Sequence, residues 1–187
     1  MNKKIELTDG ILVLRAACCD DAPAMAAAVR ESLIELQPWM DWASEAFDEV
    51  AAGRWLHFVE LGWEHASAFH FAITEAKTGR FIGCCGLDGI DQKDGRCNLG
   101  YWIRTGCTRQ GLASRAVKLA GRFAFETLEL VRIEIVIAAG NLASQRAAQK
   151  AGAHYEGLHR NRLVVHTDVY DAIIYALARA DLGLPIR

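Results

Sequence analysis

The sequence has little of what marks membrane, secreted or nucleic-acid-binding proteins. The apolar run Ile11 to Leu14 near the N-terminus is too short for a signal peptide or a membrane span. With 21 Lys and Arg against 23 Asp and Glu, the net charge is −2, and no basic stripe suggests a nucleic-acid partner. These absences exclude no enzyme class, and they make the cytoplasm the expected location.

Metal-binding and disulfide frameworks are missing as well. The six cysteines form no CxxC pair, and no histidine lies at zinc-like spacing from them. We therefore expect no metal site. We also expect the six cysteines to be buried or half-buried free thiols, with Cys107 the one thiol close to a turn that could bind a ligand.

The order of expected elements is that of an α+β protein. No repeat or linker divides the 187 residues, so a single domain over residues 1–187 is expected. Helices are predicted from Asp20 or Asp21 to Leu36 and from about Ser44 to Glu64, the second on the spacing of Val50, Trp55 and Phe58. A first strand (residues 10–17), three strands joined by turns (68–75, 80–90 and 97–104) and two last strands (153–160 and 169–178) complete the sheet.

The segment from 97 to 138 combines an antiparallel strand, a helix and a further strand. The helix over 115–128 and the apolar β-branched run over 131–138 form a βαβ unit with the preceding strand, which predicts a parallel, right-handed pairing. A further helix is expected to end at Gly152. The fold class is therefore α+β, with a mixed sheet made of an antiparallel meander plus a βαβ unit and with helices on both faces.

The turn "TGCTRQGLAS" joins this strand to its helix. It lacks the length and the lysine of a P-loop, and the chain has no GxGxxG after its first strand. Arg109 supplies a charge, while Gly111 and Ala113 let a ligand approach the backbone amides at the helix start. Two readings stay open: an anion site, or a plain helix N-terminus with small residues for packing.

The segments "NLGYWIR", "TRQGLASRAV" and "NLASQRAAQKAG" resemble the GNAT superfamily of acyl-CoA-dependent N-acyltransferases, and most of all the RimL/RimJ type that acetylates ribosomal proteins. The resemblance implies a GNAT fold with splayed strands and acetyl-CoA as co-substrate. It also implies that Thr108 to Ala113 binds the pyrophosphate, although Thr108 replaces the family's Arg or Gln. The implied cofactor-binding residues are Tyr101, Trp102, Ile103, Arg109, Gln110, Gly111, Leu112, Ala113, Ser114 and Asn141.

The same resemblance assigns catalytic roles. The tyrosine that many members use as acid would lie at Ala148 and is missing, so Ser144 is the expected acid, as in the RimL-like branch. Where that branch carries a Glu that acts as general base, this chain has Asn98, which cannot accept a proton. Either Asp88 or Asp91 acts through water, or no strong base is needed because the acceptor is an α-amine of low pKa.

The acceptor is expected against the first two helices. Trp39 and Trp42, with the acidic residues Asp41, Glu45 and Asp48, would suit a cationic amine, although both tryptophans could simply cover the sheet. His166 and Tyr170 are further candidates. The resemblance favours a protein N-terminal α-amine, as in ribosomal-protein acetylation. A small amine such as an antibiotic, a non-catalytic acyl-CoA sensor and a homodimer are left open.

Overall fold

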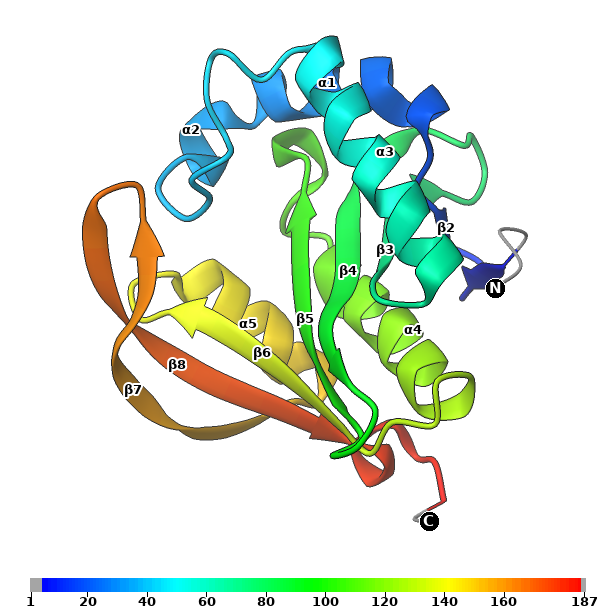
Figure 1. The fold of residues 1–187 in the computed structure, drawn as a ribbon, viewed down its shortest axis with the longest axis vertical. Coiled ribbons are helices and arrows are strands. Elements are labelled where there is room, and N and C mark those ends of the chain that lie inside the picture. The colour runs from blue at the N-terminus through cyan, green and yellow to red at the C-terminus, as the bar shows by residue number, and fades with distance from the viewer. Residues whose placement is uncertain (1–4, 186–187) are drawn as a thin grey trace.

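A computed structural model describes residues 5–185. One eight-stranded sheet of order β1-β2-β3-β4-β5-β6-β8-β7 passes through these residues, with helices on either side (Figure 1). The strands are β1 (Glu6–Thr8), β2 (Leu12–Ala16), β3 (Phe69–Glu75), β4 (Phe81–Asp91), β5 (Arg96–Ile103), β6 (Arg132–Ala138), β7 (His154–Val165) and β8 (Asp168–Ala178). The α-helices are α1 (Ala22–Glu31), α2 (Leu33–Leu36), α3 (Glu49–His65), α4 (Leu112–Glu126) and α5 (Leu142–Ala151), with short 3-10 turns η1 (Cys19–Asp21), η2 (Thr105–Cys107) and η3 (Arg179–Leu182).

The predicted βαβ unit is present. β5 and β6 form the parallel pair of the sheet, α4 connects them, and the other strand pairs are antiparallel. The parallel pairing extends over three residue pairs, from Arg96↔Arg132 to Asn98↔Glu134. Beyond that point β6 continues along β8, and Figure 1 shows β5 and β6 diverging from their shared end. The sheet is therefore open on one side of β5.

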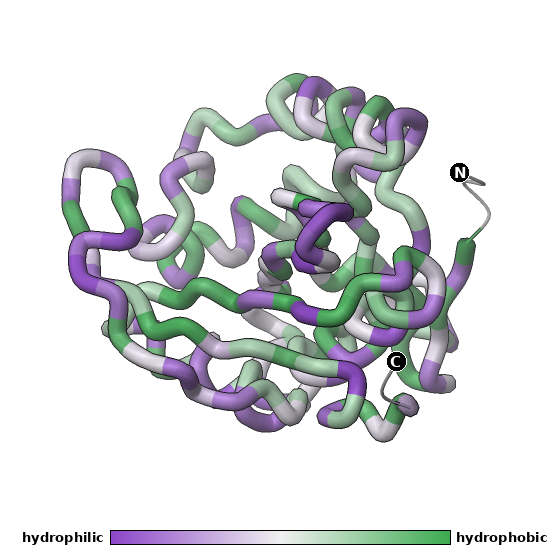
Figure 2. Tube along the Cα trace, turned by 60° about the horizontal axis from the view of Figure 1, so that its bottom comes forward, coloured by the Kyte–Doolittle hydropathy of each residue, from purple (hydrophilic) through white to green (hydrophobic). Residues whose placement is uncertain are grey.

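The core lies where the apolar strands meet the helices. Phe69 and Phe71 of β3, Trp63 of α3 and Phe123 of α4 are buried and make edge-on or tilted ring contacts with centroids 4.9–5.9 Å apart. Figure 2 shows the apolar stretches along the central strands, while polar residues dominate the outer turns. Burial of such large aromatic side chains is a major source of folding free energy.

Three expectations about the first half of the chain are wrong in detail. The helix expected over 20–36 is broken at Ser32 into α1 and α2. The second helix begins at Glu49, not Ser44, because the Asp48 carboxylate accepts the Ala51 amide as N-cap at 2.8 Å. The spacing of apolar residues also predicted the wrong buried face for this helix. Phe58 is 69% exposed, and the buried residues are Ala52, Leu56, Val59 and Trp63.

The thiols agree with expectation with one exception. Cys19 is exposed, whereas Cys18 is half-buried and the others are buried: Cys84, Cys85, Cys97 and Cys107. None forms a disulfide within the described chain. No helix within residues 5–185 is long and apolar enough to cross a membrane.

The break at Ser32 has a tertiary cause. The buried Ser32 hydroxyl accepts the Thr105 amide at 2.9 Å, and the Glu31 carboxylate accepts both Arg104 Nε (2.6 Å) and the Gly106 amide (3.1 Å). Glu35 Oε2 accepts the Thr105 hydroxyl at 2.9 Å. The end of α1 and the start of α2 are therefore tied to η2, the connection that leads from β5 to α4.

Glu31→Gln should lower the free energy of unfolding near neutral pH, by no more than about 1 kcal/mol because the ion pair is partly exposed to solvent. The hydrogen bond from Arg104 holds the pKa of the Glu31 carboxyl below its ordinary 4.5. A carboxyl group whose pKa is lowered by folding stabilises the folded state at pH values above its unfolded-state pKa. This stabilisation is lost as the pH falls through the folded-state pKa. The difference between wild type and variant should thus shrink below about pH 4.5, measured by urea unfolding at several pH values. Glu45→Gln is the matched control, since Glu45 is exposed and has no partner within residues 5–185. A difference that persists unchanged at acid pH would contradict the ionic origin.

Candidate functional site

The opening between β5 and β6 is the centre of the candidate site. β4 pairs with β5 up to Ile103, but β6 leaves β5 after Asn98. The backbone of Tyr101, Trp102 and Ile103 therefore has a strand neighbour on the β4 side alone. Unpaired strand edges of this kind bind extended amide-containing ligands by main-chain hydrogen bonds.

The turn before α4 lies at the mouth of this opening. Arg109 and Gly111 adopt left-handed backbone conformations, with φ of 62° and 76°, and Leu112 begins the helix. Because Gly111 has no side chain, the Nζ of Lys150 on α5 comes within 3.0 Å of the place that a Cβ would take. Arg109 and Gln110 are exposed, whereas Ser114 is buried and its hydroxyl donates to the Gly111 carbonyl at 2.7 Å. A helix N-terminus flanked by Arg109 and Lys150 has the electrostatics of an anion site.

The start of α5 faces β5 across the opening. Asn141 is the N-cap of α5, and its side-chain oxygen accepts the Ser144 amide at 3.0 Å. The Ser144 hydroxyl donates to the Tyr101 phenol oxygen at 3.0 Å, and the phenol donates to the Ser144 carbonyl at 2.8 Å. Burial raises the pKa of Tyr101 to about 12. The structure thus brings Tyr101, Asn141 and Ser144 together; Ala148 is buried and offers no acid.

Polar groups line the closed end of the opening. Asn98 Nδ2 donates to Asp88 Oδ1 on β4 at 3.1 Å, and Glu134 is the register partner of Asn98 on β6. Asp91, the other candidate carboxylate, lies at the end of β4 and pairs with Arg96 at 3.6 Å. Of the two candidate carboxylates, the one in contact with Asn98 is Asp88.

The loop between α2 and α3 covers the opening from the other side. The Trp42 ring contacts Trp102 of β5 (centroids 6.1 Å apart), and Trp39 contacts Tyr170 of β8 (6.5 Å). His166 Nε2 lies 3.1 Å from the Gln37 carbonyl oxygen of the same loop. The structure therefore brings all four aromatic or imidazole candidates to one wall, while Asp48 is used as a helix cap and Asp41 and Glu45 are exposed.

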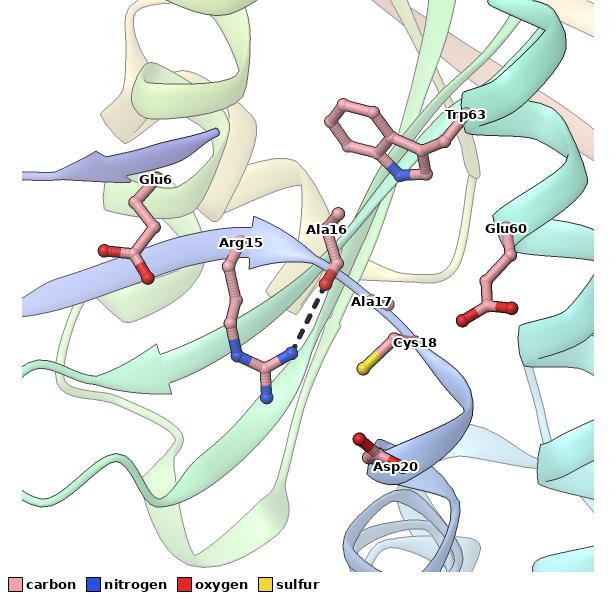
Figure 3. Close-up of a pocket in the computed structure, with 8 residues that line it drawn as sticks. All are labelled: Glu6, Arg15, Ala16, Ala17, Cys18, Asp20, Glu60 and Trp63. Carbon is pink, nitrogen blue, oxygen red and sulfur yellow. Dashed lines mark hydrogen bonds between the residues drawn. The ribbon is translucent and has the colours of Figure 1, made fainter. Parts of the chain in front are cut away.

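A separate cavity of about 610 Å³ lies at the far edge of the sheet, between β2 and α3 (Figure 3). Arg15, the cation in its wall, is already paired with Asp21 at 2.5 Å and donates to the Ala16 carbonyl at 3.3 Å. The charge of Arg15 is thus satisfied internally, and none of the candidate residues lines the cavity. Within residues 5–185, no cluster of three or more His, Cys, Asp or Glu side chains is arranged to bind a metal.

Sequence reasoning missed three contributors to the site. Lys150 and Glu134 were not singled out from the sequence. Tyr101 was named for its backbone and not for its phenol. Lys150 and Glu134 carry no local signal, because each reaches the site through the packing of α5 or through the strand register. The phenol could have been suspected, since a tyrosine in a central strand needs a hydrogen-bond partner when buried.

Comparison with known proteins gives the site a family. The family described as acetyltransferase (GNAT) domain matches residues 12–154. YdaF of Bacillus subtilis (strain 168), provisionally named a ribosomal N-acetyltransferase, is 31% identical over 103 residues, which are 55% of this chain and 56% of that protein. The match therefore spans little more than half the length of that curated relative.

Solved structures agree over more of the chain. A Vibrio cholerae protein provisionally named a ribosomal-protein-serine acetyltransferase is 30% identical with a TM-score of 0.84, covering 95% of this chain and 99% of its own. RimL, named as a ribosomal L7/L12 alpha-N-protein acetyltransferase and solved with coenzyme A, superposes with a TM-score of 0.85 at 20% identity, covering 93% and 98%. At 20% identity, the similarity to RimL concerns the fold alone. With the family match across most of its length and with its opened sheet, this chain belongs to the GNAT acetyltransferase family.

Proposed function

We propose that this protein, acting as one domain in the cytoplasm, transfers the acetyl group of acetyl-CoA to a protein N-terminal α-amine. The observation that supports the cofactor part is the left-handed turn before α4, which places a helix N-terminus beside Arg109 and Lys150 at the opening between β5 and β6. The pyrophosphate would bind the amides of residues 111–113, with Arg109, Gln110 and Lys150 around it. The pantetheine arm would then run along the free edge of residues 101–103, past Asn141. The V. cholerae relative and RimL, by their names, act on ribosomal proteins, which supports a protein acceptor.

The acetyl group would be transferred by direct attack. The amine nitrogen bonds to the thioester carbonyl carbon, the C–S bond breaks, and the proton that the amine loses restores the thiol. A backbone N–H of β5 polarises the carbonyl oxygen, and Ser144 donates a hydrogen bond to the departing sulfur. Asn98 cannot take the proton; it orients the amine, or a water that relays the proton by way of Asp88 to the departing thiolate.

The missing base favours an amine of low pKa. An α-amine, with a pKa of about 7.7–8.0, is roughly one tenth neutral at pH 7, whereas a lysine amine is neutral in about one part in 2,500. The wall made by Trp39, Trp42 and Tyr170 suits the approach of a cationic N-terminus.

A panel of acceptors tests the proposal, with thiol release from acetyl-CoA as the readout. Peptides with a free N-terminal Ser or Ala should be acetylated. The same peptides with a blocked N-terminus and an internal Lys should react at least about 10-fold more slowly near pH 7, because so little lysine is neutral. If only small amines are acetylated, the protein is a small-molecule acetyltransferase and the proposed acceptor is wrong. Tight acetyl-CoA binding without thiol release from any acceptor would make it a sensor.

Gly111→Val should weaken coenzyme A binding by about 10-fold or more, since a single charge-assisted hydrogen bond contributes roughly 1.5–3 kcal/mol. A β-branched side chain at φ 76° strains the turn, displaces Lys150 and blocks approach of the anion. Calorimetric titration of the folded variant measures the effect. Gly79→Val is the control: it has a similar φ of 70° and open space around it, and it lies in the turn between β3 and β4. Equal affinities in the two variants would remove the anion site.

Asn98→Glu should raise the rate with a peptide α-amine about 3- to 10-fold below pH 8, where most of the amine is protonated. Asp88 and Glu134, its strand neighbours, would raise the pKa of the introduced carboxyl and bring it closer to that of a useful base. The measurement is a pH–rate profile, with Asn98→Gln as the control of similar size. If both variants show the same profile, no base acts at this position.

A further inference from the structure

The contact between Tyr101 and Ser144 crosses the opening of the sheet. Tyr101 lies on β5 three residues beyond the last β5–β6 pair, and Ser144 lies in the first turn of α5, which packs on β6 and β8. Two hydrogen bonds, of 3.0 and 2.8 Å, join the phenol to the hydroxyl and to the carbonyl of the same serine. The two halves of the opened sheet are thus tied together at a residue to which the proposed function gives a catalytic role.

The direction of the Ser144 hydroxyl is unusual for its position. A serine in the first turn of a helix commonly bonds to its own local backbone. Here the backbone amide of Ser144 is taken by the Asn141 side chain, and the hydroxyl points away from its helix to the phenol on β5. The oxygen of Ser144 is therefore held toward the opening instead of against α5.

The chemistry of the pair favours hydrogen bonding over proton release. An aliphatic hydroxyl is a weak acid, and burial keeps the Tyr101 phenol protonated over the working pH range, with a pKa of about 12. Neither group loses its proton to a thiolate outright. Each hydroxyl can change its acceptor by rotating its O–H bond. The Ser144 hydroxyl can donate to the sulfur instead of to Tyr101, and the Tyr101 phenol can then donate to the Ser144 hydroxyl oxygen instead of to the Ser144 carbonyl.

We propose that the Tyr101 side chain is a positioning residue, which directs the Ser144 hydroxyl toward the departing sulfur and supports it with a second hydrogen bond. This inference rests on the proposed function of the site. The C–S bonding pair leaves on sulfur, the proton lost by the attacking amine completes the thiol, and both hydroxyls end the cycle protonated. Tyr101 therefore acts on the reaction through Ser144.

A double-mutant cycle tests this dependence, with kcat measured where chemistry limits the rate. Ser144→Ala should lower kcat about 100- to 1,000-fold, the effect of removing a hydrogen-bond donor to the charge that develops on the sulfur. Tyr101→Phe should lower it about 3- to 10-fold, the effect of losing one supporting hydrogen bond, with the KM for acetyl-CoA little changed because the backbone of β5 stays in place. The double variant should equal Ser144→Ala, because the phenol has nothing left to position.

Tyr175→Phe is the matched control for burial and packing. Tyr175 is a buried tyrosine of β8 whose phenol accepts Gln149 Nε2 at 2.8 Å and makes no hydrogen bond to Ser144. Its kcat should stay at the wild-type value. If Tyr175→Phe slows the enzyme as much as Tyr101→Phe does, the effect is one of packing and the positioning role fails.

A change of leaving group supplies a readout that a structural role would not move. A selenolate leaves more easily than a thiolate, so acetyl-selenocoenzyme A needs less help at the leaving atom. The defects of Tyr101→Phe and Ser144→Ala should both shrink with this donor. Unchanged defects, or multiplicative effects in the double variant, would overturn the inference.

Failure of the inference differs from failure of the proposed function. The cycle uses whichever amine of the panel reacts fastest, so a preference for small amines changes the acceptor and leaves the cycle intact. A Ser144→Ala enzyme at the wild-type rate would refute both the proposed role of Ser144 and the positioning role. A slow Ser144→Ala enzyme beside a normal Tyr101→Phe enzyme would refute the positioning role alone.

Discussion

The site depends on the early end of the parallel pairing between β5 and β6. Three residue pairs join these strands, whereas β6 pairs with β8 along all seven of its residues. The parting of the strands leaves the backbone of residues 101–103 unpaired on one side and places the first turns of α4 and α5 at the resulting mouth. Without it, the Gly111 turn would be an ordinary helix start and Ser144 would have no opening to face.

The sequence predicts those parts of the fold that rest on local chemistry. The parallel β5–α4–β6 unit follows from apolar runs on either side of a helix, and Gly152 ends α5 at φ 100°, as a C-terminal glycine should. The start of α3 was placed too early although Asp48 offered the cap, because the helical spacing of apolar residues does not mark where a helix begins. The break at Ser32 had no local signal, since it depends on an amide 73 residues away.

The candidate site was predictable in a similar measure. The turn around Gly111 and the serine at 144 could be named from motifs and from the family resemblance. The point at which β5 and β6 separate cannot be predicted from the sequence of either strand, because both continue as apolar runs beyond it. Lys150 enters through the packing of α5, which no spacing within a single element reveals. The Tyr101 phenol could have been suspected, but its partner Ser144 on α5 could not be identified from β5 alone.

The open side of β5 is a strand edge inside the molecule. An outer edge of this length would be exposed to pairing with other chains and so to aggregation. Here the loop bearing Trp39 and Trp42 closes one side, and the Tyr101–Ser144 contact bridges the other toward α5. The fold thereby keeps an unpaired backbone edge within reach of an extended ligand while protecting it from pairing with strands of other chains.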